Sequence, residues 1–366
     1  MIRVAIYPYD LKMLPVIRSI NRYNKKYIVT VLGAFPGSGL IGQDAGKAGN
    51  LEEMGLLVCD DIFEDSNNWD VLIVPNFKSN EPYLSSIKEV LMLANSIGKN
   101  IYTNIRFDSF KAHQKEEKTH AKDQLPVTRN KPLVDYIKYP LYQPSSFVVF
   151  IGGIQNEMDG YGLFLSLCEK LKEKYSIEAF SSVESFQCFD YHSLHQIIYD
   201  KTTDSPEKVI AINQVIQSCC DSKNPDFVII HSNEAIMEYS RDIGNGYGII
   251  PRLILTSVRP DYFVCGVPYM YSSQQIIQNF KNSIQRRLEL KAKFVYVNNT
   301  IIDPTDSTSY SAVHLPCSTL YEVDKIIGDW VTIPVMSICN KNIVEAMVSS
   351  IENEFIQHRI IYSLFK

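Results

Sequence analysis

The polar end of one apolar segment carries the residues best suited to acid–base chemistry. His231 and Glu234 follow the apolar run 227–230, in the order His-Ser-Asn-Glu. The carboxyl ends of buried parallel strands are where α/β proteins bind ligands. Either residue could act there as a general base, so both are candidate catalytic residues. The alternative is that they only cap the segment that follows.

A second candidate site is a glycine-bearing turn in the middle of the chain. Residues 147–153 read as a buried strand, 154–160 as a turn and 161–174 as an amphipathic helix. This is the layout of a phosphate-binding loop, in which backbone N–H groups at a helix N-terminus hold phosphate. Gly152 and Gly153 are therefore candidate cofactor-binding residues, with ATP or GTP as the class of cofactor.

The same turn lacks the groups that hold a triphosphate. It contains no lysine and no Gly-Lys-Ser/Thr, although P-loops place a lysine against the β- and γ-phosphates. Its charged members, Glu157 and Asp159, would repel a phosphate. We expect a degenerate loop that keeps its packing role, and nucleotide binding is the alternative.

A third candidate is a literal GxGxxG pattern formed by Gly37, Gly39 and Gly42, with Asp44 as the only acidic residue nearby. A dinucleotide fingerprint follows the first strand of its βαβ unit, whereas this pattern follows the second. Its proline and additional glycines favour an extended surface loop. Because the loop lies at the carboxyl end of a strand, these four residues are still candidate cofactor-binding residues.

Metal binding is weakly supported. His192 and His195 could share a helix face and bind a metal, but no third ligand is identifiable, so the sequence predicts no metal site. The 8 cysteines include no CxxC pair. The adjacent Cys219 and Cys220 are interpreted as packing residues, with Cys219 on the apolar stripe of its helix.

The first third of the chain alternates between strand and helix patterns. Apolar strands joined by helices imply a parallel sheet covered on both faces. We expect strands at 3–7, 27–32, 56–59, 70–75 and 101–105, and helices at 14–23 and 84–97. Residues 1–125 form a Rossmann-like α/β domain in this interpretation. Residues 111–131 are charged and nearly devoid of apolar residues, and prolines occur at Pro126 and Pro132, so we place the domain boundary there and the linker at 126–145.

Residues 146–366 form the second expected domain, with a P-loop-NTPase-like layout and a C-terminal α/β extension. Strands are expected at 147–153, 177–183, 227–231, 261–267 and 294–297, and helices at 161–174, from Ser205 onward, at 273–290 and at 342–358. Ser205 is the expected N-cap, because Pro206 follows it at the first helical position. The fold class is α/β: two Rossmann-like or P-loop-like domains with mainly parallel sheets.

Composition is that of an ordinary globular protein, 45% hydrophobic and 21% charged, with a formal net charge of -5. No basic block indicates a nucleic-acid partner. The N-terminus has no signal-peptide pattern, and no apolar run approaches the ~20 residues that span a bilayer. We expect a cytoplasmic protein that binds neither nucleic acid nor membrane.

Several short segments together resemble a family of peptide maturation system proteins. These are accessory proteins encoded beside radical-SAM enzymes in clostridial gene clusters for ribosomal peptide natural products. The segments that carry the resemblance are 36–44, 153–167, 192–193, 207–213, 224–230, 245–250 and 258–262. The chain departs from the family pattern at His231–Ala235 and at the Gly152 loop, where a nucleotide would sit.

The resemblance implies an accessory role in peptide natural-product maturation. In that role we expect the protein to recognise a precursor peptide or a modifying enzyme across the cleft between the domains. The alternative is a nucleotide-dependent, ligase-like or kinase-like enzyme that activates the peptide. A non-catalytic scaffold is the third hypothesis. The sequence leaves open whether the protein is an enzyme, and homo- or hetero-oligomers are both compatible with it.

Overall fold

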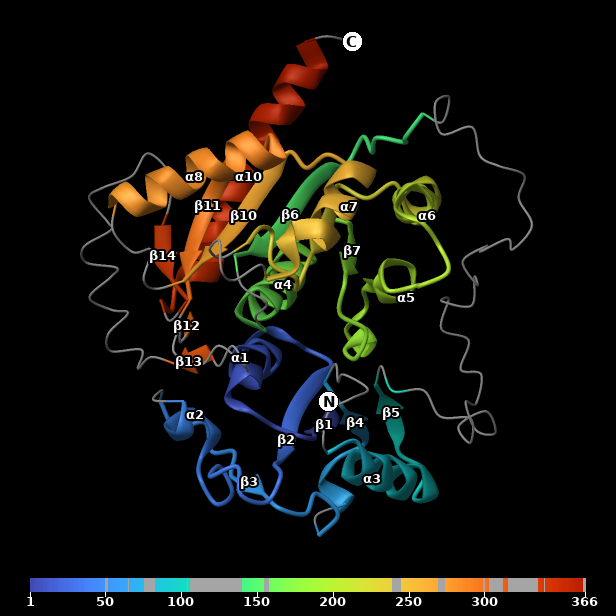
Figure 1. Cartoon of the computed structure of the whole chain (residues 1–366), viewed down its shortest axis with the longest axis vertical. Coiled ribbons are helices and arrows are strands. Elements are labelled where there is room, and N and C mark those ends of the chain that lie inside the picture. The colour runs from blue at the N-terminus through green and yellow to red at the C-terminus, as the bar shows by residue number, and fades with distance from the viewer. Residues whose placement is uncertain are drawn as a thin grey trace.

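The computed structural model describes residues 1–49, 52–64, 66–75, 83–103, 105, 140–154, 158–238, 245–268, 274–298, 300–302, 312–314, 335–338 and 340–364. These residues form two α/β units, the N-terminal one at the bottom of Figure 1 and the C-terminal one at the top. Residues 126–139 of the expected linker lie outside the described residues. The rest of it, 140–145, lies against the second unit, where Tyr142 exchanges hydrogen bonds of 2.9 and 2.8 Å with the Asn213 amide.

The N-terminal unit contains a parallel five-stranded sheet in the order β3-β2-β1-β4-β5. Its strands are β1 (Ile2–Ile6), β2 (Tyr27–Gly33), β3 (Val58–Cys59), β4 (Val71–Ile73) and β5 (Asn100–Tyr102). Its helices are α1 (Leu14–Tyr23), α2 (Ala45–Ala48) and α3 (Leu84–Ser96). Because successive side chains of a strand point to opposite faces of the sheet, Val4 and Ile6 of β1 lie on the face covered by α1, and Ala5 lies on the face covered by α3.

The C-terminal unit contains a parallel seven-stranded sheet in the order β14-β11-β10-β6-β9-β7-β8. Its strands are β6 (Phe147–Gly153), β7 (Ile177–Ser181), β8 (His192–Ser193), β9 (Phe227–His231), β10 (Tyr262–Val267), β11 (Ala292–Val297) and β14 (Val335–Ser337). A separate antiparallel pair is formed by β12 (Thr300–Ile302) and β13 (Ala312–His314).

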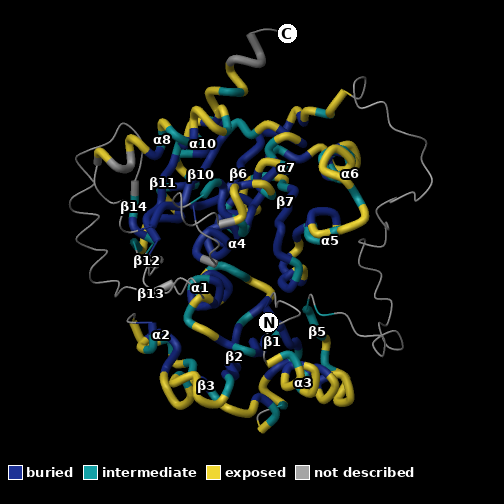
Figure 2. The backbone as a smooth tube through the Cα atoms, viewed as in Figure 1, coloured by how far each residue is buried: buried dark blue, intermediate teal, exposed yellow. Residues whose placement is uncertain are grey.

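Helices cover both faces of this larger sheet. One face packs against α4 (Met158–Leu171) and α10 (Ile343–Leu364), and the other against α5 (His195–Ile198), α6 (Ser205–Lys223), α7 (Ile249–Ser257) and α8 (Gln274–Leu288). The strands are therefore buried on both sides, as Figure 2 shows by their dark blue colour. The two-domain parallel α/β fold expected from the sequence is confirmed. The expected C-terminal extension supplies β14 to this sheet and α10 to one of its covering layers.

The two units share one hydrophobic core, because α1 packs directly on α4 (Figure 1). The Ser19 hydroxyl donates to the Gly162 carbonyl and contacts the Ser166 hydroxyl, and Ser166 donates to the same carbonyl at 3.0 Å. Gly162 permits this close approach: a Cβ there would lie 2.8 Å from the Pro15 carbonyl oxygen. Helices come this close only when the contacting residues are small.

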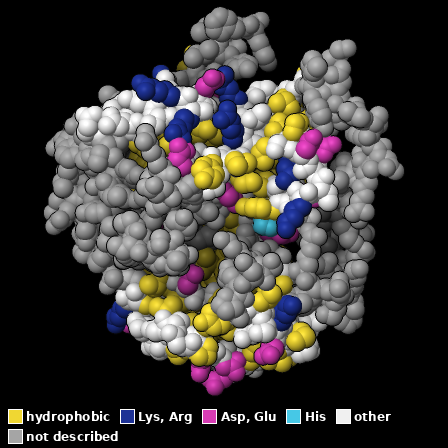
Figure 3. Space-filling view, viewed as in Figure 1, with side chains coloured by type: hydrophobic (Ala, Val, Ile, Leu, Met, Phe, Trp, Pro, Cys, Tyr) yellow, Lys and Arg dark blue, Asp and Glu magenta, His cyan; other side chains and the backbone are white. Residues whose placement is uncertain are grey.

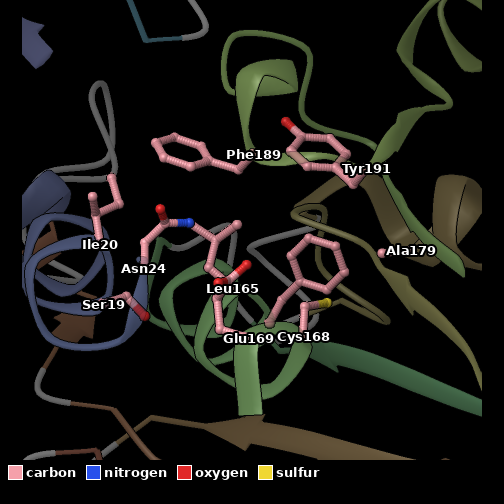
Figure 4. Close-up of a pocket in the computed structure, with 10 residues that line it drawn as sticks. Ser19, Ile20, Asn24, Leu165, Cys168, Glu169, Ala179, Phe189 and Tyr191 are labelled. Carbon is pink, nitrogen blue, oxygen red and sulfur yellow. The ribbon is translucent and has the colours of Figure 1, made fainter. Parts of the chain in front are cut away.

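A small cavity at the same interface shows how tightly it is filled. Figure 4 shows Ser19 and Ile20 of α1, with the C-cap residue Asn24, facing Leu165 and Cys168 of α4. The cavity holds about 10 Å³, which is room for about one water molecule. The two units are therefore joined by packed protein and not by a solvent layer.

Two local predictions about α6 are wrong. Its N-cap is Asp204, which accepts a hydrogen bond from the Glu207 backbone N–H while the Glu207 side chain accepts one from Asp204, in a capping box. Ser205 is the first helical residue. The buried cysteine of this helix is Cys220, whereas Cys219 is half-buried. The sequence prediction places the buried face of this helix one residue too early at this point, so it expects Cys219 to be buried in place of Cys220.

No helix in the described part of the chain is long and apolar enough to cross a membrane.

Replacing Gly162 with alanine tests the α1–α4 contact. In an unconstrained helix the change stabilises by about 1 kcal/mol. Here the new methyl group meets the Pro15 backbone, so we expect the free energy of unfolding to fall by roughly 1–3 kcal/mol in a urea titration. A gain in stability would contradict the close packing.

The capping box predicts different outcomes for two neighbouring residues. Asp204→Ala removes the N-cap acceptor, and we expect it to lower the free energy of unfolding by about 1 kcal/mol. Ser205→Ala is the matched control, with an expected change below about 0.5 kcal/mol. Equal effects of the two variants in urea titrations would argue against Asp204 as the cap.

Candidate functional site

The strand order of the larger sheet defines where a ligand site is expected. From β6 the chain moves to β7 and β9 on one side, and then crosses to β10, β11 and β14 on the other. In open parallel sheets, the crevice outside the carboxyl ends at such a reversal is the usual ligand site. Here the crevice lies at the ends of β6 and β10, beside the first turn of α4.

The side chain of Tyr296, from β11, occupies the space in this crevice. A Cβ on Gly266 of β10 would lie 2.5 Å from the Tyr296 hydroxyl oxygen, and one on Gly160 of α4 would lie 2.4 Å from it. Tyr296 is 1% exposed. Glycine at positions 160 and 266 therefore makes room for an aromatic ring between the sheet and the helix.

His231 lies at the end of β9 and is buried beside the same helix turn. Its Nδ1 is 3.0 Å from the Ser181 hydroxyl, and its ring stacks on Phe164 of α4 at a centroid distance of 5.4 Å. Burial lowers the pKa of His231 to about 3, so the imidazole is neutral at physiological pH. A pKa of about 3 makes this imidazole a weak base, because an effective general base has a pKa near the working pH. His231 is also only 1% exposed.

Glu234 is held by a different set of partners. Its carboxylate accepts hydrogen bonds from the Tyr199 hydroxyl, which follows α5, and from Ser232 at 3.0 Å. The contacts of His231 are with β7 and α4. The two candidate catalytic residues are thus near in sequence but turned to different neighbours, and their catalytic role stays a prediction.

Neutral polar groups line the buried ends of the neighbouring strands. Asn298, directly after β11, is fully buried, and neither polar atom of its amide has a hydrogen-bond partner among the described residues. The side-chain amide oxygen of Asn233, after β9, is also buried and has no hydrogen-bond partner among the described residues, although Asn233 as a whole is half-buried. An unpaired buried polar group costs about 1–3 kcal/mol, so these amides are suited to a ligand or water that supplies the missing bonds.

Gly152 and Gly153 belong to β6 itself. They pair with Cys265 and Gly266 of β10, and a Cβ on Gly152 would lie 3.0 Å from the Ile236 side chain. Gly152 therefore has a packing role. Residues 155–157 of the expected turn, including Glu157, lie outside the described residues. Asp159 lies in the first turn of α4 and is 4% exposed.

The GxGxxG loop is shaped by glycine conformation and by Asp44. Gly37, Gly39 and Gly42 have φ values of 82°, 73° and 80°, in the left-handed region that favours glycine. Asp44 is the N-cap of α2, and its carboxylate accepts backbone N–H bonds from Gly46, Lys47, Met54 and Leu56.

Burial alone raises the pKa of Asp44, but these backbone donors outweigh it and hold the pKa below its ordinary value. The carboxylate is thus occupied by the chain itself. A cofactor role for this loop stays a prediction.

A groove between the two units contains residues that the sequence analysis did not single out. It encloses about 80 Å³ and lies between α1, the first turn of α4 and the start of α10. Its basic residues are Arg18, Arg22 and Lys341, and its one acidic residue is Asp159. Its apolar residues include Leu11, Leu14, Leu163, Ile338, Ile343 and Val344. The four-residue spacing of Arg18 and Arg22 on one helix is a signal that sequence could have supplied.

These cations act together on one acidic neighbour. The Lys341 ammonium lies 2.6 Å from Glu52. With help from Arg18 and Arg22, this contact holds the pKa of Glu52 below its ordinary value. On the face shown in Figure 3, by contrast, basic side chains lie among acidic and apolar ones and do not form one block. The groove therefore gathers three basic side chains, one of them paired with Glu52, beside the buried Asp159.

His192 and His195 do not share a helix face. His192 lies on β8 and contacts Glu178, whereas His195 begins α5 and contacts the Ser182 carbonyl oxygen at 3.2 Å.

Comparison with solved structures supports the fold and goes no further. No protein-family model matches the chain, and no curated protein matches it. A DUF1611 family protein from Anabaena variabilis is similar over 96% of this chain and 100% of its own, with a TM-score of 0.54 and 10% identity. The chain therefore shares a two-domain α/β fold with that protein.

Partial similarities involve nucleotide-binding proteins. A GTPase in apo form from Pyrococcus abyssi covers 58% of this chain and 98% of its own length, with a TM-score of 0.32 and 12% identity. The 54 kDa protein of the signal recognition particle from Aeropyrum pernix, in complex with GDP, covers 62% of this chain and 52% of its own, with a TM-score of 0.31 and 11% identity. These values are too low to support an activity.

Buried neutral His231 predicts a defined pH dependence of stability. The unfolded chain binds a proton at this histidine below about pH 6.5, whereas the folded chain does not until about pH 3. Stability is therefore lost as pH falls from 6.5, at up to about 1.4 kcal/mol per pH unit. Relative to a His231→Gln variant, we expect wild type to lose roughly 2 kcal/mol between pH 6.5 and 5.

Urea titrations of both proteins at pH 5, 6.5 and 8 measure this difference. Because all other groups titrate in both proteins, subtracting the two curves isolates His231. Parallel pH profiles would show that His231 is accessible to protons in the folded protein.

Proposed function

We propose that this protein is an accessory binding protein that recognises an acidic, extended segment of a peptide or partner enzyme in the groove between its two units. The observation that carries the proposal is the combination of cations and apolar side chains in that groove. Such a surface fits an extended chain in which acidic and apolar residues alternate. The resemblance to peptide maturation system proteins makes a precursor peptide, or the enzyme that modifies it, the expected occupant.

The position of the groove also favours recognition. Its walls come from α1 of one unit and from α4 and α10 of the other, so a bound segment would contact both units. Because the α1–α4 contact is tightly packed, the walls of the groove are held in place before binding. A preformed groove lowers the ordering cost of association.

The crevice at β6 and β10 is poorly suited to a nucleoside triphosphate. Tyr296 occupies its space, and the acidic residue Asp159 lies in the first turn of α4. The described residues that contact this crevice include no lysine or arginine among those named above. Phosphate sites at helix N-termini combine backbone N–H groups with a favourable field. A nucleotide-dependent, peptide-activating enzyme remains the rival hypothesis, because the β6–turn–α4 layout is that of a phosphate-binding loop.

Fluorescence anisotropy with a labelled ten-residue peptide of alternating Glu and Leu tests the proposal. We expect saturable binding that weakens with added salt, and no binding of the matching Lys and Leu peptide. Arg22→Glu reverses a charge in the groove and should weaken binding about 10-fold or more. The matched control is Arg252→Glu, on the exposed surface of α7, with an expected change below about 2-fold.

Equal weakening by the two variants would mean that net charge, and not the groove, governs binding.

A thermal-shift titration with ATP and GTP distinguishes our proposal from the enzyme hypothesis, since a ligand of the folded state must raise the melting temperature. A nucleotide-dependent rise together with indifference to the acidic peptide would replace our proposal with the enzyme hypothesis.

A further inference from the structure

Three potential metal ligands meet at the edge of the larger sheet. Glu178 of β7, His192 of β8 and Cys219 of α6 each place a ligand atom within 4.8 Å of the other two. His192 Nε2 lies 2.7 Å from Glu178 Oε2 and 3.6 Å from Cys219 Sγ. These residues do not belong to the groove or to the crevice at β6 and β10.

We propose that Glu178, His192 and Cys219 form a binding site for a divalent transition metal of the zinc class. Oxygen, nitrogen and sulfur ligands in one cluster match the ligands that zinc accepts, at bond lengths of about 2.0–2.3 Å. Tetrahedral geometry with these lengths separates nitrogen from sulfur by about 3.6 Å and nitrogen from oxygen by about 3.4 Å. The first separation is already present, and the second requires the carboxylate to move by about 0.7 Å.

The surroundings hold the ligands in position. The His192 ring stacks on Phe180 at a centroid distance of 5.0 Å, and Glu178 is only 5% exposed. Lys223 lies 2.8 Å from Oε1 of Glu178, the oxygen that does not face His192. A polar partner on the far side of a ligating carboxylate is a usual feature of metal sites.

The cluster supplies three ligands, which leaves a fourth position of a tetrahedral site for another group. The His192 side chain is 37% exposed and Cys219 is half-buried, so the cluster lies near the protein surface. Three protein ligands with an open fourth position are typical of zinc sites that bind water or a substrate. The occupant of that position would be a small molecule with a metal-binding oxygen, nitrogen or sulfur atom.

Titration of the reduced, metal-free full-length protein with Co²⁺ and Zn²⁺ tests the site. We expect one Co²⁺ per chain with a thiolate-to-cobalt charge-transfer band, displaced by Zn²⁺. Cys219→Ser should abolish the band and weaken Zn²⁺ binding by about 100-fold or more, since even loss of an outer hydrogen-bond partner costs 10–100-fold. Cys220→Ser, at the adjacent buried cysteine, is the matched control and should retain the band.

A second variant, His192→Gln, keeps the test decisive if Cys219→Ser fails to fold. It should keep the native circular dichroism spectrum and lose most of the affinity. Absence of stoichiometric Co²⁺ and Zn²⁺ binding by wild type would overturn the proposal, as would a band that persists unchanged in Cys219→Ser and His192→Gln. Neither result would bear on peptide binding in the groove, which uses other residues.

Discussion

The contact between α1 and α4 is the constraint on which the rest of the structure depends. Gly162 has no side chain, and the adjacent Ser19 and Ser166 are small, so two helices from different units approach until backbone meets backbone. That contact merges the cores of the two sheets. It also fixes the walls of the groove and the position of the first α4 turn, next to the β6 and β10 crevice. A larger residue at position 162 would disturb all of these features together.

The large sheet could be predicted from sequence because its central strands are continuous apolar runs. Residues 147–153 and 227–231 match the expected bounds of β6 and β9. Helix positions were less exact: the expected helix 161–174 begins three residues earlier, at Met158. Asp204 and Ser205 are both good N-caps, and only the backbone geometry of the folded chain distinguishes them.

The sites could be predicted only in part. The sequence indicated His231 and Glu234 as neighbours at a strand end, but the partners of each come from α4, β7 and the residue after α5, which no local pattern specifies. The groove and the Glu178–His192–Cys219 cluster each require three separate elements to meet. Such sites have no fixed spacing in sequence, because the fold and not the motif sets the distances.

The short strands at the sheet edges have a consequence for solubility. In the described part of the chain, both sheets are bordered by strands of two or three residues: β3 and β5 in one sheet, β8 and β14 in the other. Unpaired strand edges are templates on which another molecule can add a strand, and short edges offer few backbone groups for that purpose. The long, aggregation-prone apolar strands are kept in the middle of each sheet, where both of their edges are already paired.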